Sequence, residues 1–516
     1  MADFETKKQH YLDEIGKIAK ESFNDEQKQI ARFILENATE NNIDSIYTFI
    51  TQRVKTGFVF DAAPEVAHDC IALCERDDTK SFGSPMDNAI HHKLIIGENY
   101  DVLKNLVATY TKNGQGLIDV IYIDPPYNTE KTKEDGNDYK SEVESSKFVY
   151  RDKFSRTGWL NMMKERLELA RKLLSDKGVI FISIDDNEQA YLKVLCDEIF
   201  GENNFIGNIM WDKKSGAKGV PPLNMMVNVH EYILAYAKSE LFKFKGEKRD
   251  ADADGFKNPD NDPRGPWRES NIKSTTIPKN KAFTIENPKT GKKYTNTWAF
   301  SKETLEKMIS ENRIIWKPKL PKQKEYMNEM THESKAIKDT WGVFDAQSTT
   351  VFLKKLIPNT KFDNPKPLSL MRYLLGVSTS KRDTILDFFA GSGTTGQAVM
   401  ELNEEDGGNR QCILVTNNEN NIATNVTYER LYRVVNGKGT KGEAFSWKYS
   451  EDTPYLTNNY FDVFNTVLYE LKIDDYEKSQ RLLDKAKQEF KKLNPDYEAG
   501  DLDIYNQLAS LKPYKK

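Results

Sequence analysis

Residues 117–129 read LIDVIYIDPPYNT, an apolar run that ends abruptly in an acid, two prolines and a tyrosine. The apolar part has the length and the β-branched composition of a buried strand. Proline cannot donate to a sheet ladder, so the two prolines stop the strand and stiffen the chain beyond it. The exposed tip of this strand is therefore expected to present Asp124, Pro125, Pro126 and Tyr127.

Strands and helices alternate on both sides of this stretch. Residues 159–177 have the pattern of an amphipathic helix, which we expect to end at Gly178, and VIFISIDD follows as another strand. The rhythm returns after residue 383 as TILDFF (strand), GSGTTGQAVMELN (turn and helix) and QCILVT (strand). Short buried strands that alternate with helices predict an α/β domain whose parallel sheet is covered on both faces.

The segment 205–360 interrupts this rhythm. It holds five of the seven tryptophans, and its part 211–350 carries 26 Lys and Arg against 19 Asp and Glu in a chain of net charge −4. A basic segment favours a polyanionic partner, with a solvated surface as the alternative. We expect this domain organisation: helical extension 1–90, α/β domain 91–204 and 361–437, insert 205–360, and mostly helical region 438–516.

Composition narrows the protein class. Four cysteines in 516 residues do not suggest a disulfide framework, and no run approaches 18 apolar residues. The first residues are polar and do not resemble a secretion signal. These features favour a cytoplasmic protein that neither spans a membrane nor binds a structural metal.

A glycine-rich turn, DFFAGSGTTG at 387–396, follows the strand predicted at 384–389. Its glycines let the backbone approach a ligand, and the helix behind it offers unpaired N–H groups. The spelling fits the G-x-G-x-x-G dinucleotide fingerprint, but Asp387 suits a cationic amino group, such as the methionine part of S-adenosylmethionine, better than a pyrophosphate. Glu419, after the next strand, suits ribose hydroxyls in either ligand. An ordinary tight turn without a ligand is the remaining alternative.

The tip of the first strand combines a carboxylate, a carbonyl and an aromatic ring. In open α/β sheets, ligands bind at this carboxyl edge. The set suits a planar ring with an exocyclic amine: Tyr127 stacks on the ring, while Asp124 and a proline carbonyl accept the amine hydrogens. Once they are accepted, the nitrogen lone pair is available to attack an electrophilic methyl group.

YIDPPYNT together with DFFAGSGTTGQAVMELN resembles the amino-methylating DNA methyltransferases, which pair a DPPY tetrapeptide with an FxGxG-type cofactor turn. The order of the parts, with the catalytic element first and the cofactor turn last, is similar to the circularly permuted β group of that family. In that group the insert is the target-recognition region. DEIFGENNF, DPRGPWR and NPKPLSLMRYLL extend the resemblance, over roughly residues 90–437, to the modification subunits of type III restriction systems.

The resemblance implies a Rossmann-like, S-adenosylmethionine-dependent methyltransferase sheet and a set of site residues. The catalytic residues it implies are Asp124, Pro125, Pro126 and Tyr127. The cofactor-binding residues it implies are Asp387, Phe389, Ala390, Gly391, Gly393, Thr394, Thr395 and Glu419, with Lys366 and Pro367 beside the methionine end. Candidate DNA contacts in the insert are Arg264 and Arg268.

The activity that the resemblance implies is methylation of adenine N6 in double-stranded DNA after base flipping. It also implies a homodimer and a separate restriction subunit that hydrolyses ATP and cuts DNA, because no P-loop or nuclease motif is legible in this chain. Alternatives are a cytosine-N4 methyltransferase, for which Ser is commoner at position 124, and an orphan methyltransferase. A dinucleotide-dependent oxidoreductase using GSGTTG and a catalytically idle DNA-binding subunit are alternatives outside methyl transfer.

Overall fold

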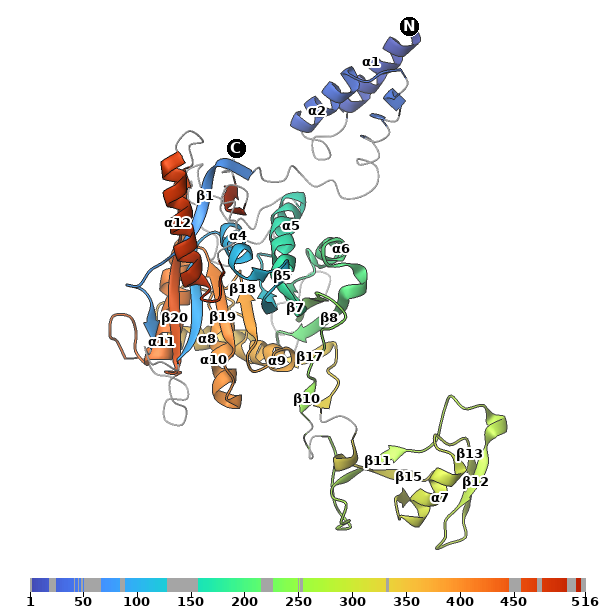
Figure 1. Cartoon of the computed structure of the whole chain (residues 1–516). Coiled ribbons are helices and arrows are strands. Elements are labelled where there is room, and N and C mark those ends of the chain that lie inside the picture. Colours follow the sequence, from blue (N-terminus) through green and yellow to red (C-terminus); the bar gives the residue numbers. More distant parts are fainter. Residues whose placement is uncertain are drawn as a thin grey trace. The chain divides into compact units, whose positions relative to one another are not determined.

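A computed structural model describes most of the chain (Figure 1). The described residues are 2–17, 25–40, 42–44, 46–47, 50, 66–83, 89–127, 156–214, 226–248, 250, 254–330, 334–444, 456–470, 476–498 and 507–511. Asn128 and Thr129 of the opening stretch lie outside this set, as do parts of the predicted terminal regions. By its contacts the described chain divides into two units, 1–243 with 338–516, and 244–337.

The first unit is built on a twelve-stranded sheet of order β17-β8-β9-β7-β6-β18-β19-β3-β20-β1-β21, with β2 paired to β20. Six neighbouring strands at its centre are parallel, which confirms the predicted parallel sheet. They are β7 (Leu174–Ile184), β6 (Ile118–Ile123), β18 (Thr384–Asp387), β19 (Gln411–Thr416), β3 (Ile90–Ile96) and β20 (Asn459–Glu470). Antiparallel pairs on both sides make the whole sheet mixed.

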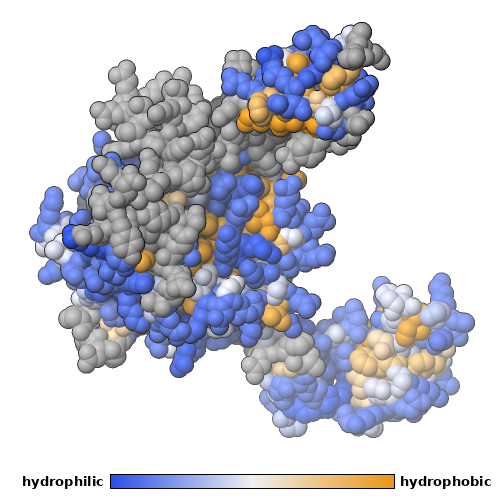
Figure 2. Space-filling view, turned by 45° about the horizontal axis from the view of Figure 1, so that its top comes forward, coloured by the Kyte–Doolittle hydropathy of each residue, from blue (hydrophilic) through white to orange (hydrophobic). Residues whose placement is uncertain are grey.

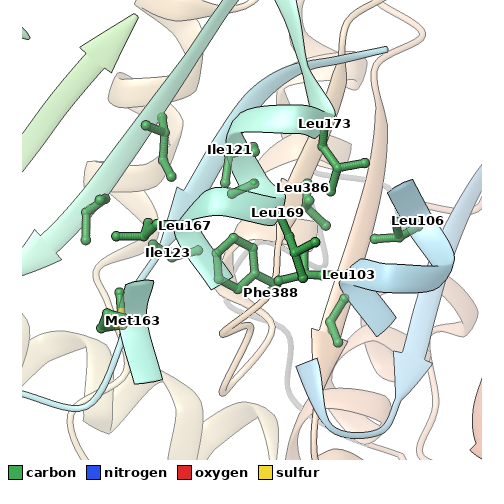
Figure 3. Close-up of a cluster of buried hydrophobic side chains, with 14 of the residues drawn as sticks. Leu103, Leu106, Ile121, Ile123, Met163, Leu167, Leu169, Leu173, Leu386 and Phe388 are labelled. Atoms are coloured by element: carbon green, nitrogen blue, oxygen red, sulfur yellow. The ribbon is translucent and has the colours of Figure 1, made fainter. Parts of the chain in front are cut away.

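Helices cover both faces of these central strands. One face is covered by α4 (Asn99–Thr109), α5 (Arg156–Leu173) and α6 (Gln189–Phe200). These helices share a hydrophobic core with the sheet, and Leu103, Leu167 and Phe388 belong to it (Figure 3). Ile121 points into this core, and its neighbour Tyr122, on the opposite face, is buried too. The remaining helices of this part of the unit are α8 (Ala346–Leu356), α9 (Leu368–Ser378), α10 (Thr394–Asp406) and α11 (Glu429–Asn436).

Among its described residues, the predicted helical extension 1–90 is helical up to residue 50 and contains strands from residue 66 on. It includes α1 (Ala2–Lys17) and α2 (Asp25–Glu36), and α2 exposes the large apolar side chains Ile30, Phe33 and Ile34. Apolar atoms are visible on this helical pair in Figure 2. Strand β1 (Val66–Arg76) pairs with β20, so Cys70 and Cys74, four residues apart, lie on one face of the sheet.

The C-terminal region is also more mixed than predicted. Its described residues include the helix α12 (Tyr476–Leu493). It is flanked by β20 and by β21 (Ala509–Leu511), which both join the sheet. Among the described residues, no helix combines the length and apolar character needed to cross a membrane.

Two further boundaries differ from the prediction. Helix α5 ends at Leu173, and β7 begins at once, so Gly178 lies inside a strand and does not end the helix. The α/β unit extends past residue 204 through β8 (Phe205–Asp212), β9 (His230–Ala237) and β17 (Thr340–Val343). These strands lie at one side of the sheet, where strand propensity depends strongly on the neighbours. Their sequences, with tryptophans and weak periodicity, therefore do not show the usual pattern of a buried strand.

The second unit, residues 244–337, has its own small core around Ile272, Trp298 and Leu305. It consists of short antiparallel sheets and one helix of ordinary length. Its elements are β10 (Glu247–Lys248), β11 (Trp267–Asn271), β12 (Phe283–Glu286), β13 (Lys293–Asn296), α7 (Lys302–Ser310), β14 (Ile314–Ile315), β15 (Lys322–Tyr326) and β16 (Ser334–Lys335).

Candidate active site

The carboxyl ends of β6 and β18 lie side by side where the strand order of the sheet reverses. From β6 the chain passes through α5 to β7 on one side, and from β18 it passes through α10 to β19 on the other. Asp124 directly follows β6, and Asp387 is the last residue of β18. Ligands of open α/β sheets bind at such a switch point. The two turns singled out in the sequence therefore meet at the place where the fold favours a site.

The turn after β6 holds its tyrosine between two carboxylates. The Tyr127 hydroxyl lies 3.0 Å from Asp124 Oδ1 and 3.2 Å from Glu231 Oε2, a residue of β9. Since a phenol has one proton, it donates to one carboxylate at a time. The carbonyl of Pro126 accepts a hydrogen bond of 2.7 Å from the indole of Trp159, which is buried in α5. This bond anchors the stiff turn to the core.

Lys366, in the segment before α9, reaches into the same place. Its Nζ lies 2.7 Å from Glu231 Oε2 and 3.2 Å from Asp124 Oδ1, and it bonds the Tyr127 hydroxyl. The same ammonium stands 4.8 Å from the centre of the Tyr127 ring. The structure thus places the Lys366 head at the Asp124–Tyr127 turn, and Pro367 is the N-cap residue of α9.

Burial and the surrounding charges act together on these groups. Burial raises the pKa of Asp124, although Lys366 opposes the shift. Burial raises the pKa of Glu231 in the same way, but Lys366 and Lys213 outweigh it and hold this pKa below its ordinary value. Burial lowers the pKa of Lys366, and the two carboxylates outweigh that effect and raise it to about 12. Lys366 is therefore a permanent cation at neutral pH, facing two acids of different proton affinity.

The acid of the glycine turn is occupied by its own loop. Asp387 is buried, and its oxygens accept hydrogen bonds from the Phe389 N–H at 3.0 Å and the Thr395 hydroxyl at 2.5 Å. Burial raises the pKa of Asp387 to about 7, against the effect of these donors. Gly391 and Gly393 have φ of 49° and 74°, values that favour glycine. The carboxyl group thus fixes the turn that joins β18 to α10.

A buried arginine lies under this turn. Arg430 of α11 donates to the Thr394 hydroxyl over 2.7 Å and to both oxygen atoms of Ser392 over 3.2–3.3 Å. Its burial lowers the pKa of the guanidinium to about 10. Gly393 is the N-cap residue of α10 and provides no capping side chain. The helix N-terminus is therefore held in place from below, while its N–H groups have no side-chain acceptor at the cap.

A hollow of about 410 Å³ adjoins the glycine turn. Its lining comes from two segments, 357–362 and 420–426, and mixes amides with apolar side chains. Phe362 of this lining lies next to Gly391, because a Cβ built there would stand 3.6 Å from Phe362 Cζ. Glu419 immediately precedes Asn420, one of the lining residues. The predicted ribose acid is thus at the margin of the hollow.

A sequence profile of DNA methylases matches residues 118–427, more than half of the chain and both turns of this site. The chain belongs to the DNA methylase family. A second profile, of an uncharacterised conserved protein, matches residues 8–115. Membership in this family removes the dinucleotide-dependent oxidoreductase as an interpretation of GSGTTG.

Curated relatives of this methylase come from two kinds of restriction–modification system. It is 35% identical over 359 residues to the StyLTI Mod subunit of a type III enzyme from Salmonella typhimurium, covering 63% of this chain and 52% of that protein. It is 32% identical over 392 residues to the type II methyltransferase M.KpnI of Klebsiella pneumoniae, covering 70% and 88%. The methylase thus spans about half the length of that Mod subunit.

A solved structure of M1.HpyAVI in complex with SAM aligns with 66% of the methylase and 98% of its own chain, at 16% identity and a TM-score of 0.32.

The two arginines predicted as DNA contacts of the methylase are engaged within the second unit. Arg264 forms an ion pair with Asp262 at 2.8 Å and donates to the Glu311 carbonyl. Arg268 pairs with Glu325 at 2.6 Å. Both guanidinium groups hold the unit together, a role that a spelling such as DPRGPWR does not reveal.

Three buried groups at the methylase site were not singled out from the sequence. They are Glu231, Trp159 and Arg430. Glu231 carried a usable signal, since HEYILAYA places one acid at the start of an otherwise apolar strand. Trp159 and Arg430 sit in amphipathic helices, where their partners depend on how distant segments pack.

Proposed function

We propose that this methylase transfers a methyl group from S-adenosylmethionine to adenine N6 in double-stranded DNA. The observation that carries the proposal is the juxtaposition of the Asp124–Tyr127 turn and the glycine turn at the switch point between β6 and β18. For methyl transfer, the amine nitrogen must lie next to the methyl group of the cofactor, so the two binding turns must be neighbours. Along the chain, the Asp124 turn comes first, the second unit follows at 244–337, and the glycine turn comes last. This order supports a circularly permuted arrangement.

The acceptor amine would be handled by the turn after β6. The base leaves the helix at a cost of a few kcal/mol, and stacking on Tyr127 recovers about 1–3 kcal/mol. Asp124 accepts a hydrogen of the exocyclic amine, which leaves the nitrogen lone pair for attack and provides a place for the proton released. The Trp159–Pro126 bond keeps the turn rigid. Most of the rate enhancement would come from this positioning.

The residues of the glycine turn fit S-adenosylmethionine, which supplies an electrophilic methyl group on a sulfonium sulfur when bound. The uncapped start of α10 at Gly393, Thr394 and Thr395 suits the methionine carboxylate. The neighbouring hollow, with amide and apolar walls, suits a purine, and Glu419 at its margin suits ribose hydroxyls. Phe389, Ala390 and Gly391 would form the backbone wall, with Asp387 fixing the turn.

Adenine is favoured over cytosine because an aspartate stands at position 124, where the resemblance gives serine to most cytosine-N4 enzymes. We also propose that the protein acts as a homodimer and as the modification subunit of a type III system, joined by a separate restriction subunit. An orphan methyltransferase without such a partner is the alternative. The second unit, which carries an excess of lysine and arginine, would contact the DNA backbone.

Methylation of unmodified bacterial DNA by the purified protein tests the proposal. After incubation with S-adenosylmethionine, single-molecule sequencing should report N6-methyladenine within one short sequence context, on one strand or both. Methylation spread over unrelated contexts, or no methylation at all, would refute a site-specific enzyme. Co-purification of a helicase-like nuclease subunit from the source cells separates the type III assignment from the alternative.

A further inference from the structure

Lys366 occupies the space that the proposed function gives to the target base. Its ammonium is 3.2 Å from Asp124 Oδ1, the acceptor proposed for the adenine amine. It also bonds the Tyr127 hydroxyl, at the edge of the ring proposed for stacking. An N–H donor on the Asp124 carboxylate is the interaction that the adenine amine would make there. The amine and the ammonium therefore compete for Asp124 Oδ1.

A second acceptor for the ammonium is already in place. Glu231 Oε2 lies 2.7 Å from Lys366 Nζ, closer than Asp124, and Glu231 is more buried, with 14% of its side chain exposed against 29%. Lys213 supports the same carboxylate from its other oxygen at 3.3 Å. A lysine head that leaves Asp124 therefore keeps a full ion pair. Only a small change of side-chain torsions is needed, because a lysine stem has four rotatable bonds.

We propose that Lys366 is an internal stand-in for the target adenine: its ammonium binds Asp124 in the free enzyme and withdraws onto Glu231 when the flipped base enters. Glu231 is then a positioning residue that acts through Lys366 and touches neither base nor cofactor. The inference rests on the proposed function. It explains why a lysine is held between two acids at this strand end.

The charged and titratable groups around Asp124 come from four elements. Lys366 precedes α9, Glu231 belongs to β9, Tyr127 shares the turn of Asp124, and Asp387 ends β18. Beyond Glu231, Lys213 follows β8, and Asp185 follows β7. Lys366 lowers the pKa of Asp124, whereas Glu231 raises it. Removing either charge should therefore move the acid limb of kcat/KM, which follows Asp124 in the free enzyme, in opposite directions.

The test compares Lys366→Met and Glu231→Gln on the DNA site found by sequencing, with 2-aminopurine in place of the target adenine. Fluorescence of this base reports flipping. Lys366→Met should raise the flipped fraction about fivefold, the equivalent of one hydrogen bond, and move the acid limb to higher pH. Glu231→Gln should lower the flipped fraction by a similar factor, raise KM for DNA and move the acid limb to lower pH.

Lys213→Met is the matched control, because it removes a cation from Glu231 without touching Asp124 or Tyr127 in the described contacts. Its effects should be smaller than those of Glu231→Gln and of the opposite sign, because Glu231 keeps its charge and loses a cation that competes with Lys366. Thermal unfolding checks each variant, and Lys366→Gln replaces Lys366→Met if the latter does not fold. A lower flipped fraction in the Lys366 variants, or an unchanged one in Glu231→Gln, would overturn the stand-in role. If the wild type methylates no DNA, the proposed function fails first, before the variants are compared.

Discussion

At the scale of single residues, Asp387 is a buried acid whose protonation is coupled to stability. Its pKa is about 7 in the folded chain, and the same carboxyl in an unfolded chain has a pKa near 4. Between these values the folded state binds more protons than the unfolded state, so this group makes the protein less stable as the pH rises. Below the lower value the group has no such effect.

Replacing Asp387 with Asn removes this dependence. Relative to the wild type, the free energy of unfolding of Asp387→Asn should rise by about 1.4 kcal/mol per pH unit between the two pKa values. Urea unfolding of the first unit at pH 5, 6 and 7 measures it. Asp339→Asn, at an exposed site of the same unit, is the control for the change in net charge. A constant difference for Asp387→Asn would mean that its carboxyl group titrates normally.

The positions of Asp124, Tyr127 and Asp387 at strand ends could be predicted, because a strand end and the turn after it are visible in a few neighbouring residues. The placement of Lys366 could not be predicted to the same degree, since its partners on β6 and β9 come from distant parts of the chain. The ion pairs of Arg264 and Arg268 could not be predicted either, because their acidic partners are known only once the second unit is folded, and DNA contact by these arginines stays a prediction.

At the scale of elements, the glycine turn must hold a left-handed residue at Gly393. A Cβ there would lie 3.2 Å from Thr427 Cγ2, and the φ of 74° disfavours any other residue. Gly393→Ala should therefore cost about 1–3 kcal/mol of stability and weaken S-adenosylmethionine binding about tenfold, because the start of α10 shifts. Calorimetric titration with S-adenosylmethionine measures the second effect.

Gly407, at the other end of α10, is a matched control. It also has a left-handed φ, of 64°, but no atom lies within 4 Å of its added Cβ. Gly407→Ala should lose stability through backbone strain while cofactor affinity stays within about twofold. Equal loss of affinity in both variants would show that the Gly393 turn is not part of the cofactor site.

Central elements were predictable from pattern, and peripheral ones were not. The strand QCILVT and the helix after the glycine turn lie where the sequence places them, since both faces of the central strands are buried. Strands β1 and β20 were missed because each pairs with a segment hundreds of residues away. The early end of α5 has the same origin, as Leu174 already pairs with Ile118 of β6.

At the scale of the whole molecule, the second unit is the proposed DNA-contacting part. Its exposed lysines at 279 and 281 form no ion pair among the described residues, in contrast to Arg268. In the double variant Lys279→Gln/Lys281→Gln, the slope of log affinity against log salt should fall by up to about 2. Arg268→Gln should leave this slope unchanged. Equal slopes for the lysine variant and the wild type would exclude this face from DNA binding.

The existence of two units was predictable from the change in composition, but their borders were not. The basic, tryptophan-rich character begins near residue 205, whereas the compact second unit begins at 244 and ends at 337. The difference arises because β8, β9 and α8 have an unusual composition yet belong to the first unit. The borders of the second unit depend on which segments pack together, and amino-acid composition does not report this.

The central claim, methyl transfer to adenine at the Asp124 turn, has a direct measurement. DNA is incubated with S-adenosylmethionine carrying a deuterated methyl group, digested to nucleosides and analysed by mass spectrometry, for the wild type and for Asp124→Asn. The account predicts deuterated N6-methyl-2′-deoxyadenosine for the wild type and a loss of about 10²–10⁴-fold in the variant, with cofactor binding retained. Deuterated N4-methyl-2′-deoxycytidine, or an undiminished signal from Asp124→Asn, would contradict it.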